Sequence, residues 1–120
     1  MPATRELAHE TWSEYFDALS KELLNASVSI EIIASPGPPM VQAHHVALQA
    51  LTYDWRDDVF EVAVARGGPR LPNVLRHVVD HPERVVVDSQ TVIAPITIAV
   101  DARDGVRTVI KIEDEAEITS

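Results

Sequence analysis

The sequence predicts an α+β fold in which an N-terminal amphipathic helix packs on a strongly bent, mostly antiparallel sheet, or on a partly open small barrel, of about six strands. All 16 valines and all 9 isoleucines lie at or after Val28, whereas residues 1–27 draw their apolar content from leucine, alanine and aromatic residues. Because β-branched side chains favour strands and lose rotamer freedom in helices, this asymmetry predicts a helix followed by strands. The loops are short, which favours antiparallel pairing because parallel neighbours need long crossovers.

The helical segment is residues 1–27, with the helix itself predicted over His9 to Asn25. Trp12, Phe16, Leu19 and Leu23 recur at helical spacing and form one apolar stripe, while charged and polar residues occupy the other faces. We therefore expect this stripe to cover one face or one open end of the sheet.

The β-rich body is predicted over residues 28–113. Val28 to Ile32 alternates with period two and stops at the proline-rich segment 35–39. The extended pattern from Val41 to Tyr53 changes parity, which predicts a β-bulge near Gln49-Ala50. An acidic turn over 54–58 then leads into a second strand through Phe60, Val62 and Val64, so the two strands form a hairpin.

The second half of the body is interrupted by the segment 66–72, which is rich in glycine and proline. Residues 73–80 after it fit a short helix or a strand, and we favour the helix. The remaining strands are predicted over 84–88, 92–100 and 106–112, with Asp104-Gly105 in a turn that needs positive φ. Pro95 cannot donate to a ladder, which places it at an edge or a bulge. Residues 114–120 form an acidic tail, and the whole chain, 1–120, is predicted to be a single domain.

Composition narrows the environment and the partners. The chain has 120 residues, no cysteine and a net charge of −9. Absence of cysteine removes disulfides and thiolate chemistry and fits a reducing cytoplasm. The negative field repels phosphate backbones, so we expect no nucleic-acid binding. Neither a signal peptide nor a membrane span is apparent, and we expect no membrane partner.

Four short motifs, taken in order, carry a resemblance to a known family. They are Thr4-Arg5-Glu6 ahead of the Trp12 and Phe16 helix, the Asp57–Val62 strand, His77 with His81-Pro82 before Arg84-Val85, and Asp104-Gly105-x-Arg107-Thr108. Together they resemble a family of small, acidic bacterial proteins classified as a domain of unknown function. The resemblance spans nearly the whole chain and implies a bacterial, single-domain protein. It implies no activity.

No catalytic residue is nominated and no cofactor is expected. The sequence lacks a G-x-S-x-G elbow, and its Gly67-Gly68 pair lacks the spacing of a phosphate-binding loop. Asp54, Asp57 and Asp58 crowd one turn, but their spacing is not that of a calcium loop, so we interpret them as turn residues.

Histidines supply the metal candidates. His77 and His81 are four residues apart and share a face if 73–80 is helical, which is a spacing that zinc sites use. Pro82 disfavours a helical conformation at His81, so we interpret both histidines as structural. We expect a chelator to leave the melting temperature unchanged and His77→Ala to cost about 1 kcal/mol. Adjacent His44 and His45 should point to opposite faces of a strand, one exposed and one partly buried.

Three functional classes follow. The favoured one is a non-enzymatic binding or assembly module that self-associates, as a homodimer, through a sheet edge or through Trp55 in its turn. The second is a histidine-dependent metal-binding enzyme or sensor. The third is a flavin-binding split barrel, to which the segment from Arg76 to Val85 is loosely similar; its phosphate would depend on Arg66, Arg70, Arg76 and Arg84.

Overall fold

The computed structural model describes residues 3–66, 73–89 and 95–113. The elements in chain order are β1 (Ala3–Glu6), a 3-10 turn η1 (His9–Thr11), α1 (Trp12–Glu22), β2 (Ser27–Ile33), β3 (Met40–Asp54), β4 (Val59–Arg66), β5 (Asn73–Asp80), β6 (Pro82–Ser89), β7 (Ile96–Ala102) and β8 (Arg107–Glu113).

One antiparallel sheet accounts for most of the described chain. Its eight strands run in the order β1-β6-β7-β8-β2-β3-β4-β5, and every neighbouring pair is antiparallel. The sheet is open, with β1 and β5 as its outer strands. The predicted antiparallel sheet is confirmed, but the expectation of about six strands, or of a six-stranded barrel, is wrong. Two strands that the sequence did not reveal, β1 and β5, form the two edges.

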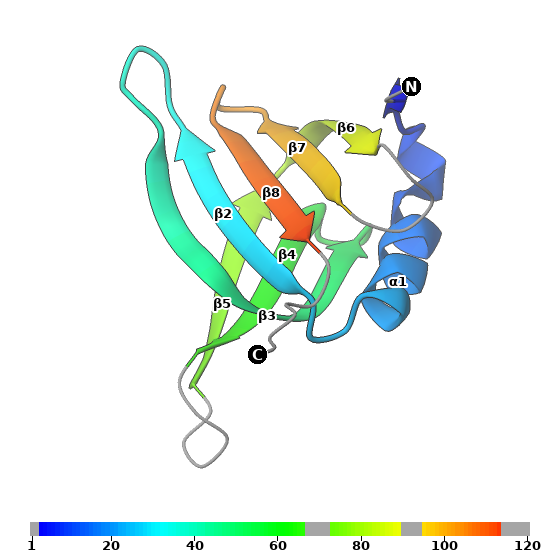
Figure 1. Cartoon of the computed structure of the whole chain (residues 1–120). Coiled ribbons are helices and arrows are strands. Elements are labelled where there is room, and N and C mark those ends of the chain that lie inside the picture. The colour runs from blue at the N-terminus through cyan, green and yellow to red at the C-terminus, as the bar shows by residue number, and fades with distance from the viewer. Residues whose placement is uncertain (1–2, 67–72, 90–94, 114–120) are drawn as a thin grey trace.

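The sheet curls so that its edge strand β5 faces β8, which lies in the other half of the sheet. Figure 1 shows β4 and β5 behind β2 and β8. The His77 ring of β5 reaches the Thr108 hydroxyl of β8, which shows that the two strands face each other. Alternate residues on the enclosed face form the core, including Val28, Val62 and Ile110, each 0% exposed. The period of two in the sequence therefore becomes one buried face and one solvated face.

Helix α1 packs against β3. Trp12 and Phe16 are buried, and the Phe16 and Phe60 ring centroids lie 4.8 Å apart. The Trp12 indole N–H donates to the Leu7 carbonyl at 3.1 Å, which satisfies a polar group inside the core. The helix is shorter than predicted. It ends at Glu22, and Asn25 beyond it has a φ of 71°.

Residues 73–80 form a strand, so the helix we favoured there is wrong. Each residue of β5 pairs with one of β4, from Arg66↔Asn73 to Val59↔Asp80. A short apolar run fits either element locally, and here pairing with β4 decides for the strand.

Other local predictions can also be compared with the structure. The ladder between β3 and β4 shifts register between Leu48 and Ala50, which confirms the predicted bulge. Gly105 has a φ of 90°, as the Asp-Gly turn requires. Pro95 marks neither an edge nor a bulge, because it precedes β7, and β7 lies between β6 and β8. A proline just before a strand removes no ladder hydrogen bond, which explains its place there.

Parts of the prediction lie outside the described residues: the segment 67–72 with Arg70, the first residues of the strand predicted over 92–100, and the acidic tail over 114–120. Among the described helices, none has the length and apolar character needed to cross a membrane.

Candidate functional site

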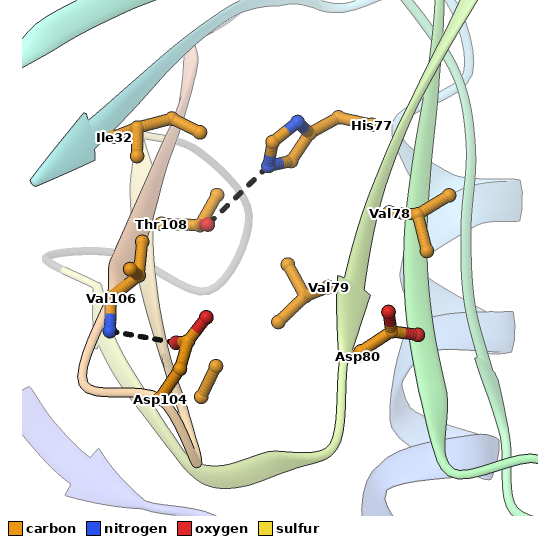
Figure 2. A pocket seen from close by; sticks show the side chains of 9 residues that line it. Ile32, His77, Val78, Val79, Asp80, Asp104, Val106 and Thr108 are labelled. Atoms are coloured by element: carbon orange, nitrogen blue, oxygen red, sulfur yellow. Dashed lines mark hydrogen bonds between the residues drawn. The ribbon is translucent and has the colours of Figure 1, made fainter. Parts of the chain in front are cut away.

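The inner face of the edge strand β5 forms one wall of a cavity. Along β5 the odd-numbered residues turn inward, which buries Val79 and leaves Leu75 and His77 half-buried. The opposite wall is Thr108 on β8, a polar side chain only 2% exposed. His77 Nε2 lies 3.4 Å from Thr108 Oγ1, a long separation for a hydrogen bond. Figure 2 shows this contact at the top of the cavity.

The cavity has a volume of about 180 Å³. Its lining residues are Ile32, His77, Val78, Val79, Asp80, Ala102, Asp104, Val106 and Thr108. A second hollow of about 140 Å³, lined by Leu75, Ile30 and Val64 among others, also includes His77. His77 therefore lines both spaces, and burial lowers the pKa of its ring. A neutral imidazole offers one hydrogen-bond donor and one acceptor there.

A hydrogen-bonded cluster of His9, Tyr53, Asp58 and His81 lies where β5 turns into β6. The Tyr53 hydroxyl donates to Asp58 Oδ1 at 2.7 Å, and His81 Nδ1 lies 3.2 Å from Asp58 Oδ2. His9 Nε2 is 3.0 Å from the Tyr53 hydroxyl. We call these four residues the corner cluster.

The backbone at this corner is also fixed, by hydrogen bonds and by an unusual conformation. Asp58 and His81 have φ angles of 55° and 51°, a left-handed conformation that non-glycine residues rarely adopt. The His81 N–H donates to the Asp58 carbonyl at 2.9 Å, and the His81 carbonyl accepts from the Arg103 N–H at 3.0 Å. The corner cluster thus ties the start of β4 to the turn between β7 and β8.

Electrostatics in the corner cluster follow from its contacts. Burial, together with the hydrogen bond to Asp58 and its negative charge, raises the pKa of Tyr53 to about 12. The Tyr53 hydrogen bond and the nearby His81 lower the pKa of the Asp58 carboxyl. Tyr53 stays protonated and Asp58 stays charged at neutral pH, so the hydrogen bond between them persists at that pH.

The two metal candidates do not form a common site. His77 points toward Thr108 in the interior, whereas His81 points toward Asp58 at the corner. Their shared face depended on a helix that the structure replaces with β5 and a bend. Nowhere in the described ranges do three or more histidine or acidic side chains gather in a way that could hold a metal ion.

His44 and His45 differ from the expectation of opposite faces. Both are exposed, and their ring centroids are 4.1 Å apart. His45 has a φ of 52°, and the ladder between β2 and β3 is irregular there. The irregularity breaks the alternation of side chains and brings the two rings to one side.

Trp55 lies in the β3–β4 turn and is 65% exposed, with the Arg56 guanidinium 5.2 Å from its ring. Two of the three aspartates of this turn, Asp54 and Asp58, make different contacts. Asp54 accepts the Arg56 N–H at 3.0 Å, while Asp58 belongs to the corner cluster. Asp54 is therefore a turn residue, as expected, whereas Asp58 has a further role in the corner cluster.

Two of the arginines considered for a flavin phosphate are paired with carboxylates. Arg76 lies 3.2 Å from Glu61, and Arg84 lies 3.1 Å from Glu6. Arg70 and the side chain of Arg66 lie outside the described residues.

Sequence reasoning missed Thr108, Tyr53 and His9 as members of these clusters. Thr108 and His77 are 31 residues apart, and His9 and Tyr53 are 44 apart, so no local pattern links them. One signal was present: a threonine on the buried parity of β8 needs a polar partner, and an inward-facing histidine can supply it.

Comparison with known proteins places the chain in a family. Residues 3–119 match the model of a family of unknown function, DUF5335. A protein of Aquifex aeolicus (strain VF5), which carries the name "Uncharacterized protein", is 30% identical over 111 residues; the match covers 92% of this chain and 93% of the relative. No solved structure matches the chain. The match spans nearly the entire sequence, as the resemblance predicted, and the chain therefore belongs to the family of unknown function DUF5335.

Proposed function

We propose that this protein is a non-enzymatic assembly module of the bacterial cytoplasm that forms a homodimer through the free edge of β5. The observation that carries the proposal is the set of outward-facing residues on this edge strand, Arg76, Val78 and Asp80. When two copies of the strand pair antiparallel about Val78, the basic Arg76 of each copy lies opposite the acidic Asp80 of the other, so the strand is complementary to itself. An interface of this kind suits a two-fold dimer, because the same patch serves both copies.

The pairing register shows which backbone groups of β5 are free to pair. The His81 N–H donates to the Asp58 carbonyl, which makes Asp58 and His81 a hydrogen-bonded pair at the end of the β4–β5 ladder. Such pairs alternate along an antiparallel ladder. The N–H and C=O groups of Val74, Arg76, Val78 and Asp80 therefore point away from β4, toward an added strand.

Side chains on the same residues favour one alignment of the two copies. If a two-fold axis passes through Val78, the Val78 side chains meet and each Arg76 faces the second copy's Asp80. Val78 is 50% exposed, so its contact removes apolar surface from water. Shifting the axis to Arg76 would set two like charges against each other. Arg76 already contacts Glu61, and two carboxylates can share its guanidinium.

The other edge of the sheet is less suited to pairing. Strand β1 has four residues, Ala3–Glu6, and its described side chains include the charged Arg5 and Glu6. Short, charged edge strands resist pairing with other chains. Strand β5 has eight residues and carries exposed valines at positions 74 and 78.

Sedimentation velocity and native mass spectrometry of the full chain test the proposal. We expect a species of twice the 13.2 kDa chain mass at micromolar concentration. Val78→Lys should give a monomer, because the two-fold axis brings the new charges together. Arg76→Glu and Asp80→Lys should each weaken the dimer, and the double variant should restore it, since the pair is then reversed.

Trp55→Ser is the matched control, because Trp55 is also an exposed apolar residue and lies in a turn. It should leave the dimer unchanged. Circular dichroism confirms that each variant is folded. A wild-type chain that sediments only as a monomer would falsify the proposal, and so would a dimer that survives Val78→Lys. Loss of the dimer in Trp55→Ser alone would move the interface to the β3–β4 turn.

A further inference from the structure

We propose that the cavity between β5 and β8 is a binding site for a small primary amine with a short apolar body. The proposal rests on the shape and chemistry of the cavity and does not require the dimer. A cavity of about 180 Å³ can hold a molecule of the size of benzene. The amine would enter with its apolar body between the two walls and its ammonium group at the rim.

The walls of the cavity supply the apolar contacts. Val79 projects from β5, and Ile32 and Val106 project from the opposite side, as Figure 2 shows. Apolar walls with a few placed polar groups are typical of small-molecule sites. This arrangement favours a ligand with a hydrocarbon body over a fully polar one.

Asp104 supplies the charge that selects an amine. One oxygen of its carboxylate accepts the Val106 N–H at 3.0 Å, and Figure 2 shows the other oxygen directed toward the cavity. The neighbouring arginines are engaged elsewhere, Arg103 with Glu83 at 3.6 Å and Arg107 with Asp101 at 2.6 Å. No ion pair in the described part of the chain involves Asp104, so its charge is available to a cation.

His77 and Thr108 complete the polar side of the cavity. Their 3.4 Å contact is long, so a ligand that bonds either group gives up little by replacing it. Burial lowers the pKa of His77, so at neutral pH its ring is uncharged and does not repel an ammonium group. The net charge of −9 also attracts cations and repels anions. The cavity therefore favours an amine over a carboxylate of the same length.

Three probes of equal chain length separate charge from shape: n-butylamine, n-butanol and sodium butyrate. Each is titrated into the full chain at pH 7.5 and constant ionic strength, and binding is followed by the amide and methyl NMR signals of Val79, Val106 and Thr108. We expect saturable shifts with n-butylamine at a Kd on the order of 10 mM, as its few atoms allow. Butanol should bind several-fold more weakly, and butyrate should give no saturable shift.

Two variants test whether Asp104 causes the preference for the amine over the alcohol. In Asp104→Asn the amide oxygen still accepts the Val106 N–H, so the turn is preserved while the charge is lost. This variant should lose most of the preference for n-butylamine over n-butanol, although Asp80 also lines the cavity and keeps its charge. Asp57→Asn removes a charge at a residue that does not line the cavity and should retain the wild-type preference for the amine.

The proposal is overturned if no probe gives saturable shifts at the cavity residues, or if butyrate binds as well as the amine. It is also overturned if Asp104→Asn keeps the full wild-type preference for n-butylamine. Sedimentation of the same samples records the oligomeric state, so failure of the ligand site and failure of the dimer are separate results.

Discussion

At the scale of single residues, buried and half-buried titratable groups make the stability of the fold depend on pH. His77 and Tyr53 both lie against the core, and both have shifted pKa values because burial disfavours their charged forms. Their shifts have opposite signs, because histidine is charged when protonated and tyrosine when deprotonated. Each group therefore destabilises the fold at a different end of the pH range.

His77 should make the protein less stable in mild acid. Its folded-state pKa lies below the unfolded value of about 6.5, so the unfolded chain binds the proton more readily. The stabilisation is complete above about pH 6.5 and is lost as the pH falls from there through the lower folded-state pKa. Urea unfolding at pH 8 and pH 5.5 should show a smaller pH effect in His77→Gln than in the wild type. His44→Gln, an exposed control, should keep the wild-type effect, and an unchanged pH effect in His77→Gln would contradict the burial argument.

Tyr53 should titrate late in alkali. Its pKa is about 12, so it should remain protonated at a pH at which the tyrosines of the unfolded chain ionise. The unfolded tyrosine ionises near pH 10, and the stabilisation from Tyr53 is therefore lost above that pH. Difference absorbance near 295 nm should show a late step that is missing in Tyr53→Phe. A wild-type titration complete by about pH 10.5 would contradict both the burial of Tyr53 and its bond to Asp58.

At the scale of elements, Ser20 joins the helix to the sheet. Its hydroxyl lies 2.8 Å from the Phe16 carbonyl and 2.9 Å from the Leu51 carbonyl, and it accepts the Leu51 N–H at 2.7 Å. Leu51 follows the bulge of β3, where the ladder with β4 changes register. The serine thus supplies a partner for a backbone group of β3 and sets the position of α1.

Ser20→Ala should destabilise the protein by about 1–3 kcal/mol, because the Leu51 N–H is left half-buried without an acceptor. Chemical denaturation at pH 7.5 measures the loss. Ser13→Ala, on the exposed side of the same helix, should change the free energy of unfolding by less than about 0.5 kcal/mol. Equal effects of the two substitutions would mean that the Ser20 contacts do not stabilise the packing of α1 on β3.

At the scale of the whole molecule, the net charge of −9 sets the partners that the surface tolerates. Several cations already pair with carboxylates, such as Arg76 with Glu61 and Lys21 with Asp17. We expect no retention of a duplex or single-stranded oligonucleotide at about 150 mM salt, because contacts to phosphate weaken steeply with salt. Fluorescence anisotropy with a labelled oligonucleotide measures this. Micromolar binding at that salt would show a basic surface that the described residues do not reveal.

Local periodicity was sufficient to predict most of the elements. The alternation from Val28, the change of parity near Gln49 and the Asp104-Gly105 turn each depend on residues close in sequence, and the structure has a strand, a bulge and a turn at these places. The antiparallel sheet followed from short loops. The match of residues 3–119 to the family model agrees with motifs that were also visible in the chain.

Only the tertiary structure decided what lies at the edges and in the cavity. The run from Val74 to Val79 suits a helix or a strand, and pairing with β4 made it the edge strand. Its place at the edge in turn leaves Val78 exposed and turns His77 toward Thr108, 31 residues away. Composition and periodicity describe neighbours along the chain. Which strand is last in the sheet, and which side chains meet across it, depend on long-range pairing that a single sequence does not encode in any local pattern.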